Sequence, residues 1–255
     1  MHRAAVRAEG AASVQAACDE GATGRRRGSR SCPEQDQTLR FHEVSRSFGR
    51  GSRRRAVLCG LSLELPPGSA VYIGGSNGAG KTTLLRIAAG MLAPDEGEVT
   101  LGPLHPRRDW LRFHQRIGFA SAGDRGLYAR LSVRAHLDFW TAIALMSARE
   151  RARAIRAALI GFGLAHLADR RADRLSQGQR QRLRLALAFV HKPQVVLLDE
   201  PRNSLDEDGL AMLGAAVGEL LSRSGAVLWC APLGERQPVD FDRTLRLEDG
   251  RLWPA

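Results

Sequence analysis

Residues 75–82 read Gly75-Ser76-Asn77-Gly78-Ala79-Gly80-Lys81-Thr82, which is the pattern G-x-x-x-x-G-K-[ST]. Its glycines allow the chain to turn so that consecutive backbone N–H groups point at phosphate oxygens. In this pattern the lysine, Lys81, reaches the β- and γ-phosphates of a nucleotide, and the hydroxyl of Thr82 binds Mg²⁺. We expect the whole octet and Thr83 to contact the nucleotide.

The residues around this octet favour a phosphate loop over an incidental glycine-rich turn. Residues 70–73 form a short apolar run typical of a strand, residues 81–89 have helical spacing, and Gly90 is a candidate helix stop. A strand followed by a loop and a helix is the context that the motif requires, because the helix N-terminus attracts anions. Only Lys81 and Lys192 among the 38 basic residues are lysines, so a lysine retained in the loop indicates chemistry.

Composition limits the class of protein. A chain of 255 residues is long enough for one domain with a subdomain. No apolar run approaches ~18 residues, so none is expected to span a membrane. Four scattered cysteines without metal-type spacing indicate a reduced, cytosolic protein. The net charge is +11, and residues 105–185 hold 17 arginines and six acidic residues, which indicates either an anionic partner surface or a solvated arginine-rich face.

The hydrophobic pattern predicts strands alternating with helices. Residues 1–37 lack periodicity and are expected to be a disordered extension, followed by one domain over 38–255. Ser147 and Glu150 fit a capping box that starts a helix, with Ile155, Leu159 and Ile160 expected on one face. The expected strands are 39–44, 56–63, 98–101, 195–198 and 225–230, and a hairpin is expected over 243–253. This order predicts an α/β fold.

Two acidic residues follow the apolar run 195–198. A buried parallel strand delivers the residues after its C-terminal end into the ligand crevice. Asp199 is therefore expected to hold Mg²⁺, directly or through water, and Glu200 to polarise the attacking water.

A third segment, Leu175-Ser176-Gln177-Gly178-Gln179, begins another helix. Ser176 and Gln179 fit a second capping box, which alone indicates an ordinary helix start. The alternative is a second phosphate-binding helix N-terminus, made of a serine hydroxyl and the flexible backbone of Gly178.

Together the three segments resemble the ATP-binding cassette (ABC) ATPases, and the resemblance extends from about residue 39 to 253. The family signature is usually Leu-Ser-Gly-Gly-Gln, and Gln177 stands at its third position. The resemblance implies a P-loop NTPase of the ABC ATPase type, with a mainly parallel core sheet, an antiparallel β subdomain and a helical subdomain at about 123–185. It also implies that Ser176, Gly178 and Gln179 of one subunit complete the ATP site of another, in a homodimer or heterodimer.

The same resemblance implies a partner and a direction of transport. Ser204-Leu205-Asp206 matches the Asp-containing loop of the family, and Phe48 matches the aromatic residue that stacks on adenine. The stretch 123–131, Gly-Asp-Arg-Gly-Leu-Tyr-Ala-Arg-Leu, is similar to a variant in bacterial exporter-type members, which work with a separate membrane-spanning permease. The implied protein is an ATP hydrolase with ATP and Mg²⁺ as cofactors. It would power an exporter through ATP-driven dimer closure, at the cytoplasmic face of the cell membrane.

The chain departs from the family pattern at two positions. Ala122 stands where a glutamine commonly follows a core strand, although some exporter relatives also lack it. Pro232 stands where a histidine contacts the γ-phosphate, and proline has no backbone donor. We therefore expect ATP binding with slow hydrolysis.

Three alternatives stay open at this point. A degenerate or regulatory half-site fits Pro232. A soluble ABC protein acting on nucleic acid fits the arginine-rich residues 105–185. However, Leu175 follows Lys81 by only 94 residues, which leaves no room for a long coiled-coil insertion, and there is a single cassette, so nucleic acid is not the expected partner. A small-molecule kinase would not need the segment 175–179.

Overall fold

The computed structural model describes residues 36–121, 123, 126–234 and 238–255, and most of the expected N-terminal extension lies outside them. The strands are β1 (Leu39–Phe48), β2 (Arg55–Leu65), β3 (Ala70–Gly74), β4 (Glu96–Leu101), β5 (Ile117–Ala120), β6 (Val195–Asp199), β7 (Ala226–Ala231), β8 (Arg243–Glu248) and β9 (Arg251–Pro254). The helices are α1 (Lys81–Ala88), α2 (Trp110–His114), α3 (Val133–Ile143), α4 (Ala148–Gly161), α5 (Gln177–Phe189) and α6 (Glu207–Ser222), with short 3₁₀ turns at Gly51–Arg53, Ala165–Leu167 and Ala172–Arg174.

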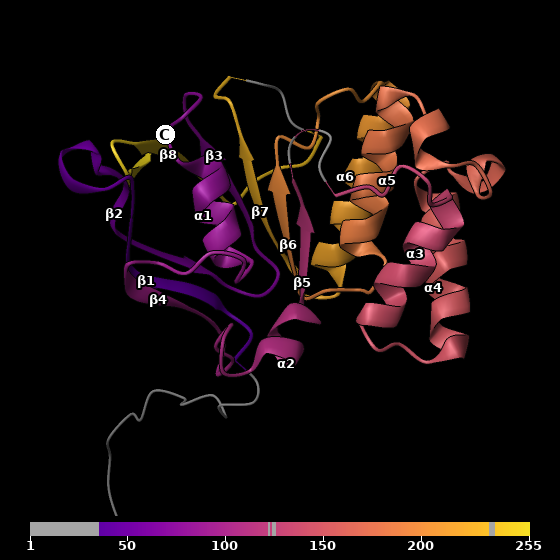
Figure 1. Cartoon of the computed structure of the whole chain (residues 1–255), viewed down its shortest axis with the longest axis horizontal. Helices are drawn as coiled ribbons and strands as arrows, with labels where there is room; N and C mark the ends of the chain where they lie inside the picture. The colour runs from indigo at the N-terminus through magenta and orange to yellow at the C-terminus, as the bar shows by residue number, and fades with distance from the viewer. Residues whose placement is uncertain (1–35, 122, 124–125, 235–237) are drawn as a thin grey trace, which may run out of the picture. The chain divides into compact units, whose positions relative to one another are not determined.

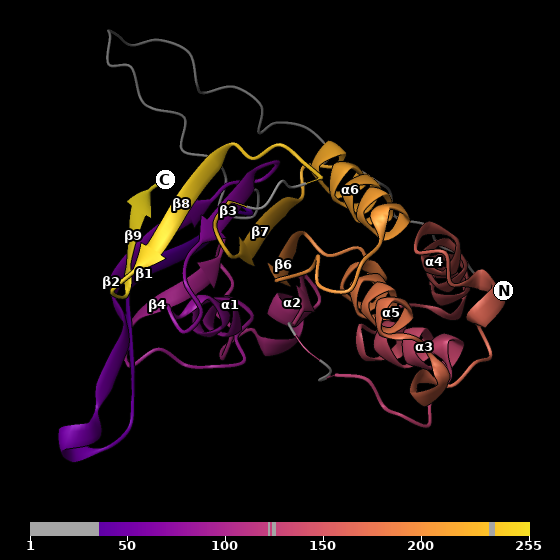
Figure 2. The same ribbon diagram turned by 90° about the horizontal axis from the view of Figure 1, so that it is seen from above.

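The core is a six-stranded sheet in the order β5-β6-β7-β3-β8-β9 (Figures 1 and 2), parallel except for the final hairpin β8-β9. Every residue of the strands β3, β6 and β7 is buried. Both faces of this sheet are therefore covered, as is usual for parallel sheets. The parallel pairing brings the carboxyl ends of β3, β6 and β7 to one edge. That edge is where ligands bind in open α/β sheets.

Alternate residues of the central strands pack into two different hydrophobic cores. In β6, Val196 and Leu198 pack with helices α3–α6, whereas Val195 and Leu197 pack with α1 and the second sheet. Successive side chains of a strand point to opposite faces, so one apolar run fills both cores. The core sheet therefore lies between the helices α3–α6 on one side and α1 on the other (Figure 2).

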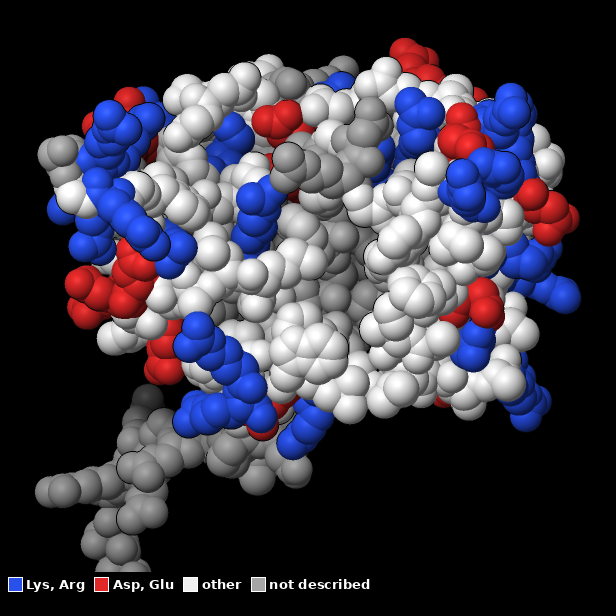
Figure 3. Space-filling view, in the orientation of Figure 1, with Lys and Arg blue, Asp and Glu red and all other residues white. Residues whose placement is uncertain are grey.

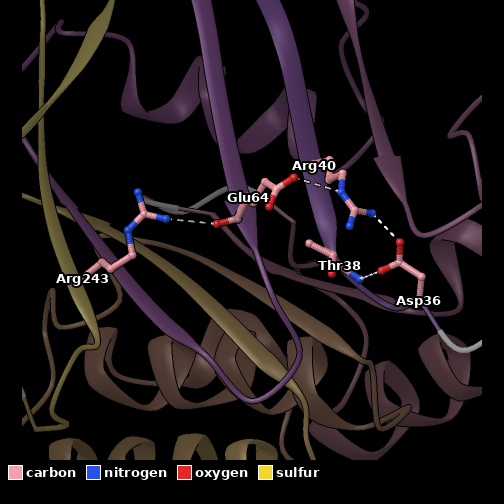
Figure 4. Close-up of polar contacts among 5 residues, drawn as sticks. All are labelled: Asp36, Thr38, Arg40, Glu64 and Arg243. Carbon is pink, nitrogen blue, oxygen red and sulfur yellow. Dashed lines mark hydrogen bonds and ion pairs between the residues drawn. The ribbon is translucent and has the colours of Figure 1, made fainter. Parts of the chain in front are cut away.

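The second sheet is antiparallel, with the order β2-β1-β4. Polar contacts fasten its edge (Figure 4): Arg40 Nε donates to Glu64 Oε1 at 3.1 Å, and Arg243 of β8 donates to the Glu64 carbonyl at 3.4 Å. Arg40 also pairs with Asp36. Burial raises the pKa of Asp36, but hydrogen bonds from Thr38 and Arg40 outweigh it and leave this pKa lowered. The Arg243 contact links the antiparallel sheet to the core sheet.

The α/β prediction and the position of the hairpin are confirmed, and so is the capping box of Ser147 and Glu150 at the start of α4. One face was wrong. Ile155 and Leu159 are buried, but Ile160 is 67 % exposed. A helix turns by about 100° per residue, so Ile160 points well away from the stripe that Ile155 and Leu159 share one turn apart.

A buried histidine fastens α3 to the segment before it. His136 is fully buried, its Nδ1 lies 2.9 Å from the Ser132 carbonyl, and its Nε2 accepts the Tyr128 N–H at 2.9 Å. An Nε2 that accepts carries no proton, so the ring is neutral with the proton on Nδ1. Burial lowers the pKa of His136, and also that of His191, whose ring lies 3.1 Å from the Ile117 carbonyl.

These two histidines predict a loss of stability in mild acid. Because their folded-state pKa values are lowered, the unfolded chain binds more protons, and the free energy of unfolding falls as the pH drops below about 6.5. Each contributes at most about 1.4 kcal/mol per pH unit in that window. The free energy of unfolding should be measured by urea unfolding at several pH values between 5 and 8. It should change less steeply with pH in His136→Gln than in wild type. The exposed His166→Gln is the control, and equal slopes in all three proteins would contradict the prediction.

Candidate nucleotide site

The segment between β3 and α1 has the geometry of a phosphate loop. Gly78 and Gly80 have positive φ angles of 84° and 109°, which side-chain-bearing residues rarely adopt. A Cβ on Gly80 would also lie 2.8 Å from a methyl group of Val57. The loop closes through the Ala79 N–H, which donates to the Ser76 carbonyl at 3.2 Å. Both glycines therefore serve the turn, and Gly80 also serves the packing of the loop against β2.

Lys81, the first residue of α1, lies inside this loop. It is only 5 % exposed, and its Nζ donates to the carbonyls of Gly75 at 2.7 Å and Ser76 at 3.0 Å. A buried ammonium needs compensation, and carbonyl oxygens carry only partial negative charge. The position of Lys81 therefore favours an anion in the loop, which is what a nucleotide phosphate would supply.

Thr82 and Asp199 meet at the carboxyl edge of the sheet. The Thr82 hydroxyl donates to Asp199 Oδ2 at 2.8 Å, and Asp199 is 2 % exposed. A hydroxyl and a carboxylate are the hard oxygen ligands that Mg²⁺ prefers. Among the described residues no cluster of three His, Cys, Asp or Glu side chains could hold a metal by itself. The pair fits a Mg²⁺ that takes its other ligands from phosphate and water, so the residues present fit a magnesium nucleotide.

Glu200 directly follows β6 with a left-handed backbone, at φ 47°. Its N–H donates to the Cys230 carbonyl of β7 at 2.7 Å, and its carboxylate accepts from Asn203 Nδ2 at 2.9 Å. The charges at this edge act on the buried thiol of Cys230. Burial is the main cause that raises the pKa of this thiol, Asp199 raises it further, and Lys81 lowers it. The chain thus brings Lys81, Thr82, Asp199 and Glu200 to one edge of the sheet.

The segment 175–179 lies elsewhere. Ser176 caps α5 and forms the expected capping box with Gln179. Gly178 is required by its surroundings, because a Cβ there would lie 2.8 Å from the Ser204 carbonyl. Figures 1 and 2 show α1 and α5 on opposite sides of β6. The structure therefore does not bring Ser176, Gly178 and Gln179 to Lys81 within one chain.

A model of the ABC transporter family matches residues 58–203, more than half of the chain. The protein belongs to the ABC transporter family. It is 41 % identical over 172 residues to the cytochrome c biogenesis ATP-binding export protein CcmA of Ruegeria pomeroyi, covering 68 % of this chain and 76 % of that protein. It is 28 % identical to the ABC transporter ATP-binding protein NatA of Bacillus subtilis, covering 82 % and 85 %. The chain is therefore an ATP-binding and ATP-hydrolysing subunit of a transporter.

Solved ABC structures share the fold. An ATP-binding subunit of an ABC transporter superposes with a TM-score of 0.75 at 22 % identity, covering 84 % of this chain and 87 % of that one. A dimeric ATP-binding cassette in a post-hydrolysis state, bound to ADP and Pi, gives a TM-score of 0.74 at 23 % identity, covering 84 % and 96 %. At these identities the likeness shows the fold.

The first departure of this ABC subunit from the family pattern, Ala122, lies outside the described residues, as do residues 124 and 125 of the exporter-like stretch. The second, Pro232, directly follows β7. The Tyr72 hydroxyl donates to its carbonyl, and the Leu233 side chain occupies the space above Gly74, where a Cβ would lie 2.1 Å from a Leu233 methyl carbon. An apolar, tethered turn thus stands at the edge of the sheet next to the phosphate loop.

One expected residue, Phe48, remains, and two residues that were not expected contact the segment around Glu200. Phe48 ends β1, is 43 % exposed, and has the Arg46 guanidinium 4.9 Å from its ring centroid, so its role in adenine stacking stays a prediction. Sequence reasoning missed Asn203 and Gln181. Gln181 is buried in α5, and its Nε2 donates to the Pro201 carbonyl at 2.9 Å. A glutamine among apolar positions of a helix, and an asparagine three residues after the proposed base, were the available signals.

Proposed function

We propose that the carboxyl edge of the core sheet binds magnesium ATP and hydrolyses it through four side chains. Lys81 and the loop N–H groups of residues 75–80 hold the phosphates, and the loop extends to Thr83 through the start of α1. Thr82 and Asp199 hold Mg²⁺, which when bound neutralises charge on the β- and γ-phosphates. Glu200 orients the attacking water and accepts its proton. The observation that carries this proposal is the buried Lys81 ammonium beside the contact of Thr82 with Asp199.

A second subunit completes the site in this proposal. Helix α5, which Ser176 caps, and helix α1, which begins at Lys81, lie on opposite sides of β6. Ser176 stands at the N-terminus of a 13-residue helix. Helix N-termini bind phosphate. The segment therefore acts on the nucleotide of a facing subunit, in a homodimer or a heterodimer, and ATP closes that dimer.

A groove on the face shown in Figure 3 supports a permease as the partner. It encloses about 860 Å³ between α2, β5 and α3, and its lining includes Met91, Trp110 and Ile143, each more than half exposed. The groove reaches Thr82 and Asp199. We propose that a cytoplasmic segment of a separate permease occupies this groove, so that its movement and the nucleotide site are coupled.

The proposed cargo direction is export, at the cytoplasmic face of the cell membrane. The curated relatives include export proteins, such as the Nod factor export ATP-binding protein I of Paraburkholderia xenovorans at 34 % identity over 218 residues. They also include an iron import protein. The similarity of residues 123–131 to the variant of exporter-type members favours export. No described helix is long and apolar enough to cross a membrane, and a permease would supply the spans.

The test of nucleotide binding uses the two lysines of the chain. Lys81→Ala should weaken the affinity for magnesium ATP by at least about tenfold in titration calorimetry, because it removes a charge-assisted contact with phosphate. Lys192→Ala is the matched control, since Lys192 is exposed. An unchanged affinity of Lys81→Ala, or no magnesium-dependent binding by wild type, would refute the proposed site.

A further inference from the structure

The loop after Glu200 holds the Glu200 side chain through Asn203. Asn203 Nδ2 donates to Glu200 Oε2 at 2.9 Å, and the Asn203 backbone N–H donates to the Glu200 carbonyl at 3.2 Å. Main chain and side chain of Asn203 therefore both contact the same residue. A glutamate side chain has several rotamers, and fixing one of them costs conformational entropy that a hydrogen bond to the carboxylate offsets.

The loop that carries Asn203 is itself fixed. Gln181 holds the Pro201 carbonyl, and the Arg184 guanidinium donates to Gln181 Oε1 at 2.7 Å; Gln181 and Arg184 are both buried. Further along, Asp206 caps α6 through the Gly209 N–H at 2.9 Å and pairs with Arg182 of α5. Because the loop is anchored on both sides of Asn203, its amide presents a donor at a defined place.

The chemistry of this contact suits a base that must face water. The amide is neutral, so it neither takes nor gives a proton at working pH. It engages one carboxylate oxygen, Oε2, so the second oxygen of Glu200 is the one that accepts from the attacking water. On the side of β7, Pro232 has no N–H with which to orient any group. The main chain of Glu200 is held by the Cys230 carbonyl of β7, and the hydrogen bond to its carboxylate comes from its own loop.

We propose that Asn203 is a positioning residue for ATP hydrolysis, acting through the Glu200 carboxylate. The inference rests on the proposed function, because it requires Glu200 to be the base. Asn203 does not bind ATP, so its replacement lowers the rate of the chemical step and leaves nucleotide affinity unchanged. A carboxylate at this position repels Glu200, so Asn203→Asp is more damaging than Asn203→Ala.

The test measures single-turnover hydrolysis and ATP affinity separately, in full-length protein. Asn203→Ala should slow the chemical step about tenfold, as loss of one hydrogen bond to a charged group predicts, and Asn203→Asp should slow it further. Asn203→Gln, which keeps the amide on a longer side chain, should recover part of the rate. Glu207, an exposed carboxylate in the first turn of α6, provides the control, and Glu207→Gln should retain the wild-type rate.

A double variant separates positioning through Glu200 from a general structural effect. If Asn203 acts through the carboxylate, Asn203→Ala should have no further effect on the residual rate of Glu200→Gln. An equal further loss in the Glu200→Gln background, a wild-type rate for Asn203→Ala, or weaker ATP binding that accounts for the loss would each overturn the proposal. If the proposed function itself is wrong, Glu200→Gln alone should keep the wild-type rate. That result distinguishes its failure from failure of the proposal for Asn203.

Discussion

Glu200→Gln is expected to lower the rate of ATP hydrolysis by about a thousandfold while the affinity for magnesium ATP stays near that of wild type. Glutamine keeps the size and hydrogen-bonding shape of the side chain but cannot accept a proton from water, and general base catalysis contributes about 10²–10⁴. Glu200 follows β6 at the edge where Lys81, Thr82 and Asp199 also lie. Those groups would still hold the nucleotide, so the loss belongs to the chemical step.

The measurement is steady-state phosphate release together with calorimetric ATP affinity. Glu207→Gln is the matched control, because Glu207 is an exposed carboxylate only seven positions further along the chain, in the first turn of α6. Its turnover should equal that of wild type. Turnover by Glu200→Gln within tenfold of wild type would show that another group activates the water.

The turn between β3 and α1 and the position of Asp199 at the edge of the sheet were predictable because local sequence encodes them. The left-handed glycines Gly78 and Gly80 and the apolar run before Gly75 dictate a turn between a strand and a helix. The run 195–198 predicted a strand buried on both faces, which placed Asp199 at the carboxyl edge of the sheet. A motif that depends only on the backbone conformation of neighbouring residues can be predicted without knowing which distant segments are in contact.

Contacts between distant segments could not be predicted in this way. The hydrogen bond from Gln181 to the Pro201 carbonyl joins a helix to a loop 20 positions away, and its existence depends on how α5 packs on the sheet. Ile160 was assigned to the buried face because it is apolar, although the helical period excludes it. The separation of Ser176 from Lys81 likewise follows from the order of the strands and not from either motif.

The other large effect is expected at Pro232, where the natural residue is predicted to limit turnover. Phosphoryl transfer depends mainly on positioning and on donors aimed at the developing charge, and one such donor is worth about 10²–10³ in rate. Pro232 follows β7, the strand between β6 and β3, so it stands at the same edge as Asp199 and the phosphate loop. We expect Pro232→His to raise the rate of ATP hydrolysis by up to about a hundredfold.

The backbone at this position is suited to the exchange. The Tyr72 hydroxyl holds the carbonyl of Pro232 and not its ring, so a histidine can take the same main-chain position and direct its imidazole toward the terminal phosphate. Pro232→Ala is the control, because it removes the ring without adding a side-chain donor, and its turnover should stay near that of wild type. Phosphate release should be measured for the subunit alone and with its permease. Brisk wild-type turnover that the histidine does not raise would mean that the electrostatics of the site are complete without a donor after β7.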